Sequence, residues 1–144
     1  MAGLAWSLAA CGGPDQGASA SPETILARDR AAAYFANGAL DKARAALAPL
    51  LAGKRPAPQD LLRAAAIELR AHELTQARDF AERALAADPK NAGAHYIYGR
   101  ILEQQDFRQT EQAMAEYRRV LELVPGDVAA KACLGRALGL LDPH

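Results

Sequence analysis

Residues Ala77–Pro89 read ARDFAERALAADP, and this stretch contains the pattern that the rest of the chain repeats. Small and apolar residues three or four positions apart fall on one side of a helix. In this stretch they are Ala77, Ala81, Ala84 and Leu85. We expect the helix to end at Asp88, because the proline that follows has no amide hydrogen to donate to the preceding turn.

The same stripe recurs at a nearly constant spacing along the chain. The residues 34 positions before it are Ala43, Leu47, Leu50 and Leu51, and those 36 positions after it are Ala113, Tyr117, Val120 and Leu121. A small residue followed by larger ones, repeated at about this period with a closing proline, is typical of stacked helical repeats. The pattern therefore predicts an all-α fold built from repeated helix pairs.

The composition agrees with one helical domain. At 144 residues the chain can form a single continuous core, and its richness in alanine with only 6% aromatic residues favours helices over strands. Basic and acidic residues number 17 each, so the chain lacks the net positive charge that would attract it to nucleic acid. We therefore expect no nucleic-acid partner.

Start and stop signals divide the chain into helices. Ser21-Pro22-Glu23 predicts the first helix start, because serine caps free amides and proline suits the first turn. Asn37-Gly38 and His72-Glu73 predict turns inside helix pairs. We predict seven helices: 22–37 and 40–51, a second pair within 58–87, a third within 92–123, and a final helix, 128–141, without a partner.

From Thr24 to its end the chain resembles the tetratricopeptide repeat (TPR) family. The third repeat matches the family pattern best, with Tyr98, Gly99 and Leu102 on its first helix, Ala113, Tyr117 and Val120 on its second, and Pro125 at its end. Its two extra residues are placed in the turn at 105–109. The resemblance implies an α-solenoid of about three helix-turn-helix pairs plus a final unpaired helix, occupying residues 22–141.

The resemblance also implies a binding surface, because in this family the first helix of each pair lines a concave groove for peptides or helices. The corresponding positions are Arg28, Phe35, Arg63, Arg70, Tyr96, Arg100, Glu103 and Arg136. Aromatic side chains among arginines suit a protein segment with apolar anchors and acidic groups. Alternatively, the arginines are solvated or pair with neighbouring glutamates. Ala32 and Ala66 replace the asparagines with which some family members clamp a C-terminal carboxylate, which argues against that activity.

The first eleven residues resemble a bacterial lipoprotein signal. Leu8-Ala9-Ala10-Cys11 matches the lipobox, in which the cysteine is acylated, although the usual preceding lysine or arginine is absent. Residues 12–21 are rich in glycine and serine and predict a flexible tether. Lipid on Cys11 would hold the protein on the periplasmic side of a bacterial membrane. The alternative is a cytoplasmic protein in which Cys11 has no such role.

Catalytic, cofactor and metal-binding patterns are not recognised. His72-Glu73-Leu74-Thr75-Gln76 departs from the zinc-protease motif at Gln76 and falls in a predicted turn. We expect His95 to pack in the core and Cys133 to be a small buried residue. Two scattered cysteines are too few for a thiolate zinc site.

The favoured function is therefore a non-enzymatic, lipid-anchored scaffold that binds protein partners during assembly of an envelope complex, such as a pilus, a secretion system or the cell wall. A soluble cytoplasmic TPR adaptor and a TPR module cut from a larger enzyme are the alternatives. The helix predicted at 128–141 is apolar almost all round, whereas terminal repeats are usually polar outside. We expect it to self-associate or to be the edge of a truncated array.

Overall fold

The computed structural model describes residues 20–141, and this part of the chain contains seven α-helices and no strand. The helices are α2 (Pro22–Ala36), α3 (Leu40–Leu51), α4 (Pro58–Arg70), α5 (Leu74–Ala87), α6 (Ala92–Gln105), α7 (Thr110–Leu123) and α8 (Val128–Leu141). The all-α prediction is confirmed. A short 3-10 helix, η1 (Phe107–Gln109), occupies the turn in which the two extra residues were predicted.

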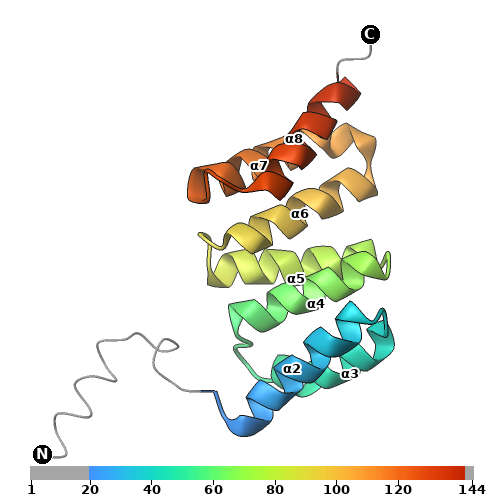
Figure 1. Cartoon of the computed structure of the whole chain (residues 1–144), viewed down its shortest axis with the longest axis vertical. Coiled ribbons are helices and arrows are strands. Elements are labelled where there is room, and N and C mark those ends of the chain that lie inside the picture. Colours follow the sequence, from blue (N-terminus) through green and yellow to red (C-terminus); the bar gives the residue numbers. More distant parts are fainter. Residues whose placement is uncertain (1–19, 142–144) are drawn as a thin grey trace, which may run out of the picture.

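The helices form antiparallel pairs that stack along one axis (Figure 1). Helix α2 pairs with α3, α4 with α5, and α6 with α7, while α8 packs on α7 at the end opposite α2 (Figure 1). Each pair buries its apolar stripe partly against its neighbour, so the core is continuous along the stack. None of the described helices is long and apolar enough to cross a membrane.

Local side-chain chemistry sets the helix boundaries. The Ser21 hydroxyl accepts a hydrogen bond from the amide of Thr24 at 3.2 Å, and Asn91 caps α6 in the same way. The turn inside the first pair uses Gly38 at a φ of 76°, which costs glycine little. His72 has a φ of 62° in the α4–α5 turn, so the predicted turn at this motif is confirmed.

Small residues occupy the tightest positions of the core. Ala43, Ala77 and Ala113 are equivalent in the three pairs, and all three are completely buried. Tyr117 is the largest fully buried side chain among the described residues, and it packs against Gly99 on the neighbouring helix. The repeating alanines therefore bring the paired helices close together, as the sequence pattern predicts.

Two acidic side chains on α4 are buried and neutralised by the first helix pair. Asp60 is held by Arg28 of α2, and Glu68 is held by Arg44 of α3, with nitrogen–oxygen distances of 2.7–2.8 Å. The two carboxylates are only 3% and 5% exposed. Buried charges need such partners, so these ion pairs fix the position of the second pair against the first.

Candidate functional site

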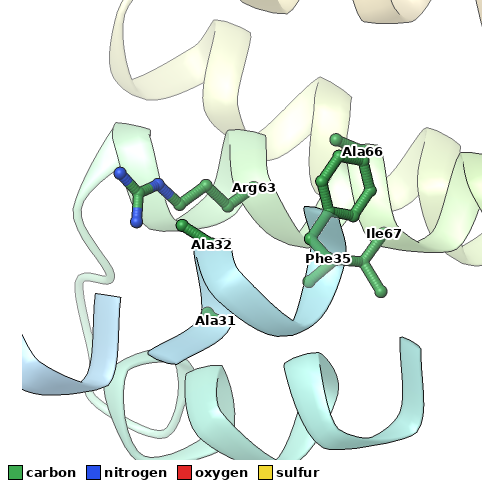
Figure 2. A pocket seen from close by; sticks show the side chains of 6 residues that line it. All are labelled: Ala31, Ala32, Phe35, Arg63, Ala66 and Ile67. Carbon is green, nitrogen blue, oxygen red and sulfur yellow. The ribbon is translucent and has the colours of Figure 1, made fainter. Parts of the chain in front are cut away.

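Helices α2 and α4 enclose an apolar hollow of about 200 Å³. Its lining residues are Ala31, Ala32, Phe35, Arg63, Ala66 and Ile67 (Figure 2). The alanines leave the space open, while Phe35 and Ile67 lie on one side and Arg63 on the other (Figure 2). The hollow can therefore take an apolar side chain beside a cation.

A second hollow, of about 280 Å³, continues the first toward α6. It is lined by Phe35, Ala66, Leu69, Arg70, His72, Ile97, Arg100 and Gln104. The two hollows share Phe35 and Ala66, so they form one depression along the first helices of the three pairs. We call the residues that line the two hollows the inner groove.

Two arginines of the inner groove are oriented by backbone carbonyls. Arg63 donates a hydrogen bond to the carbonyl of Arg28 at 2.9 Å, and Arg70 donates to the carbonyl of Phe35 at 2.5 Å. The Arg70 guanidinium also lies 5.0 Å from the centre of the Phe35 ring. Within the described residues neither arginine forms an ion pair with a carboxylate. Their remaining N–H groups can therefore donate to an acidic ligand.

Arg28, unlike Arg63 and Arg70, forms an ion pair with a carboxylate of the protein. Its Nε and Nη2 donate to the two carboxylate oxygens of Asp60, both at 2.8 Å. These hydrogen bonds raise the pKa of Arg28 above its ordinary value, against the opposing effect of burial. Arg28 lines neither hollow. Its partner is an aspartate of the next helix pair, whereas the sequence suggested pairing with neighbouring glutamates.

Three further predicted residues, Tyr96, Glu103 and Arg136, meet where α6, α7 and α8 join. Glu103 accepts hydrogen bonds from the Tyr117 hydroxyl at 2.5 Å and from Arg136 at 3.1 Å. Arg100 donates to the Tyr96 hydroxyl at 3.3 Å. The hydrogen bond to Glu103 raises the pKa of Arg136. This network links three helices, so its residues have a structural role whether or not they also bind a partner.

The structure thus separates the eight predicted groove residues into two sets. Phe35, Arg63, Arg70 and Arg100 line the inner groove. Arg28, Glu103 and Arg136 make hydrogen bonds between helices, and the Tyr96 hydroxyl accepts one from the Cys133 thiol of α8. A binding role for either set stays a prediction. Cys11 and the lipobox lie outside the described residues.

Sequence reasoning missed Ile97 and Gln104 as groove residues. They lie 34 positions after Arg63 and Arg70, respectively, so the repeat period itself was a sufficient signal. His72 also lines the groove, and it follows α4 in a left-handed turn that brings it to the edge of the second hollow.

Cys133 and His95 were also weighed as possible reactive residues, and both lie in contacts between helices. Cys133 is buried, as predicted. His95 was predicted to pack in the core, but it is only partly buried: its Nδ1 lies 2.6 Å from a carboxylate oxygen of Glu116 and its Nε2 lies 2.7 Å from the carbonyl of Pro89. It therefore bridges α6 to α7 through polar contacts. Within residues 20–141 no group of three or more His, Cys, Asp or Glu side chains is arranged to hold a metal ion.

Comparison with known proteins identifies the fold. No protein-family profile matches the sequence, and no curated protein does. The first TPR of Spaghetti (RPAP3), bound to the HSP90 peptide SRMEEVD, has a TM-score of 0.76 and 21% identity, covering 85% of this chain and 95% of that one. The first TPR domain of human RPAP3 gives 0.74 and 21%, covering 81% and 91%. The Arabidopsis OM64 TPR domain gives 0.72 and 21%, covering 78% and 92%.

These solved domains share the helix pairs and their stacking with the described part of this chain, and similarity at this level of identity establishes the fold. In this chain a final helix, α8, follows the three pairs. The chain therefore folds as an all-α solenoid of three TPR helix pairs followed by a final helix.

Proposed function

We propose that this protein is a non-enzymatic scaffold whose inner groove binds a segment of a partner protein that carries an apolar anchor beside acidic groups. The observation that carries the proposal is the apolar hollow at Phe35 and Ala66, flanked by Arg63 and Arg70, which no described carboxylate neutralises. Two similar solved domains support it, because they are bound to the acidic peptides SRMEEVD of HSP90 and SGPTIEEVD of HSP70.

The arrangement favours binding in two ways. Burying an apolar side chain in the hollow stabilises the complex by about 25 cal/mol for each Å² of apolar surface removed from water. Arg63 and Arg70 are already oriented by backbone carbonyls, so less side-chain entropy is lost when they meet a carboxylate. Arginine also presents parallel N–H donors that match the two oxygens of a carboxylate.

We propose that the ligand is not a C-terminal carboxylate of the kind that some TPR domains bind through asparagines. Ala32 and Ala66, which stand at the asparagine positions of that clamp, line the apolar hollow and offer no side-chain donor. We therefore propose an internal acidic segment, whose apolar residue rests between the two alanines and whose acidic residues reach Arg63 and Arg70.

A peptide titration tests this proposal. Fluorescence anisotropy would compare acetylated and amidated EELFEE, its charge-reversed counterpart KKLFKK, and SRMEEVD with a free carboxyl terminus. We expect EELFEE to bind most tightly. Ala66→Leu, which fills the hollow, should weaken binding at least tenfold, and Arg63→Ala about fivefold. Arg118→Ala, at an exposed arginine on α7, is the matched control. Equal affinity for EELFEE and KKLFKK would reject the groove as an acidic-segment site.

We also propose that the protein acts at a bacterial envelope, held on the periplasmic side by lipid on Cys11, and that it assists assembly of a pilus, a secretion system or the cell wall. The sequence Leu8-Ala9-Ala10-Cys11 supports this location. Stable attachment would need more than one acyl chain. Labelling of full-length protein with palmitate in bacteria should mark the wild type but not Cys11→Ser. Equal absence of label would favour the cytoplasmic adaptor.

A further inference from the structure

The outer face of the final helix, α8, is open where the equivalent face of α6 is covered. The two helices correspond at a spacing of 36 residues, so Gly135 of α8 is equivalent to Gly99 of α6, and Leu138 to Leu102. On α6, helix α7 covers these positions. On α8, we call the exposed residues Val128, Lys131, Ala132, Gly135, Leu138 and Gly139 the α8 face.

The two glycines show the difference directly. A Cβ built on Gly99 would lie 2.7 Å from the Tyr117 ring, whereas a Cβ built on Gly135 meets no atom of the described residues within 4 Å. The leucines agree, because Leu102 is 1% exposed and Leu138 is 47% exposed. The α8 face thus has the same small residue and apolar neighbour against which Tyr117 packs on α6, but within the described residues no large side chain packs there.

The charges on α8 indicate what could cover this face. On α6, His95 lies 2.6 Å from Glu116, the residue that precedes Tyr117 on the covering helix. The residue equivalent to His95 on α8 is Lys131, which is exposed. Helix α8 contains Lys131 and Arg136 but no acidic residue between Val128 and Leu141. A covering helix that carries an acidic residue next to its large side chain would therefore complement Lys131.

We propose that the α8 face binds an amphipathic helix of another protein, with a small residue, an acidic residue three positions later and a large apolar or aromatic residue immediately after it. The helix α7 carries this pattern as Ala113, Glu116 and Tyr117. The large side chain covers Gly135 and the acidic one pairs with Lys131. This site lies outside the inner groove, so it is separate from the proposed peptide binding.

A second copy of the chain suits the α8 face less well. Two α8 faces in contact would each contribute Lys131, with no acidic residue on either helix to offset the two like charges. The α7 helix of a second copy cannot serve either, because its Ala113 and Tyr117 are already fully buried against its own α6. A separate helix with the same pattern has neither obstacle.

A binding experiment uses the sequence of α7 itself as the probe. A fluorescent peptide of residues 110–123, acetylated and amidated, would be titrated into the full chain and followed by anisotropy. We expect binding that Gly135→Leu weakens at least tenfold, because leucine fills the place of the incoming large side chain. Ala33→Leu, at an exposed position of α2, should change the affinity less than twofold.

A charge exchange gives a second, independent measurement. Lys131→Glu in the chain should weaken the wild-type peptide about fivefold and should restore binding of a Glu116→Lys peptide. Circular dichroism would verify that each variant folds. The proposal is overturned by peptide binding that is unaffected by both Gly135→Leu and Lys131→Glu, or by absence of binding at millimolar peptide. It is also overturned by a dimer in sedimentation that Gly135→Leu dissociates, because a second copy would then be the occupant.

Discussion

Gly99 lies against the ring of Tyr117: a Cβ built on this glycine would be 2.7 Å from Cε1 and 3.1 Å from Cδ1 and Cζ of the ring. Tyr117 is fully buried and its hydroxyl donates to Glu103 at 2.5 Å, so α6 contacts both one edge of the ring and the hydroxyl. The absence of a side chain at position 99 is therefore what lets α6 and α7 approach each other around a buried tyrosine.

Alanine substitutions at the two equivalent glycines should have opposite effects. Gly99→Ala should lower the free energy of unfolding by about 1–3 kcal/mol, because the new methyl group displaces the Tyr117 ring. Gly135→Ala should raise it by about 0.4–1 kcal/mol, since alanine favours helix and its Cβ meets no atom of residues 20–141 within 4 Å. Urea unfolding of both variants checks this. Equal destabilisation by the two would contradict the assigned packing.

The ion pair between Arg28 and Asp60 predicts a large penalty when one partner is removed. Arg28→Ala leaves a carboxylate that is 3% exposed without its donor, which should destabilise the protein by about 3–5 kcal/mol. The double variant Arg28→Met/Asp60→Leu should be within about 1 kcal/mol of the wild type, because no buried charge remains. Thermal and urea unfolding compare them. If Arg28→Ala were harmless, the pair would not anchor α4 to α2.

Tyr117 predicts a loss of stability at alkaline pH. Burial, helped by the hydrogen bond to Glu103, raises the pKa of Tyr117 above its ordinary value of 10.0. The unfolded chain therefore loses the phenolic proton near pH 10 while the folded chain keeps it, and stability falls as the pH rises further. The contribution is about 1.4 kcal/mol per pH unit. We expect the free energy of unfolding, measured from pH 8 to 12, to fall less steeply above pH 10 in Tyr117→Phe than in the wild type. The two slopes should differ by about 1.4 kcal/mol per pH unit. Identical slopes would contradict the burial of an un-ionised phenol.

The fold could be predicted because its determinants are local and repeated. The start of α3 at Leu40 and the range of α8, Val128–Leu141, follow from turn residues and helical periodicity alone. The alanines that recur every 34 to 36 residues are buried because each occupies the same close contact between two helices. Such a signal survives in a single sequence, since every repeat reports it again.

The site was only partly predictable, because a position on the groove side of a helix does not say which partner a charged side chain selects. Arg28 and Arg63 both lie on first helices, yet Arg28 forms an ion pair with the buried Asp60 on the next pair, while Arg63 donates to the backbone carbonyl of Arg28. That choice depends on where α4 sits relative to α2. The sequence pattern contains the two arginines and the aspartate but not the distance between the helices.

Arg70 offers a final prediction that separates charge from geometry in the inner groove. Its guanidinium lies over the Phe35 ring, 5.0 Å from the ring centre, and donates to the Phe35 carbonyl, so these two contacts position it at the groove. Arg70→Lys keeps the charge but loses the planar stacking surface and the fixed fork of donors. We expect the EELFEE peptide to bind about twofold to fivefold more weakly, the equivalent of about 0.4–1 kcal/mol, close to the strength of an exposed cation–π contact. Arg118→Lys, at an exposed arginine of α7, should leave the affinity unchanged. Full affinity in Arg70→Lys would show that positive charge alone serves the groove, whereas the structure predicts that the arginine must also be held in place.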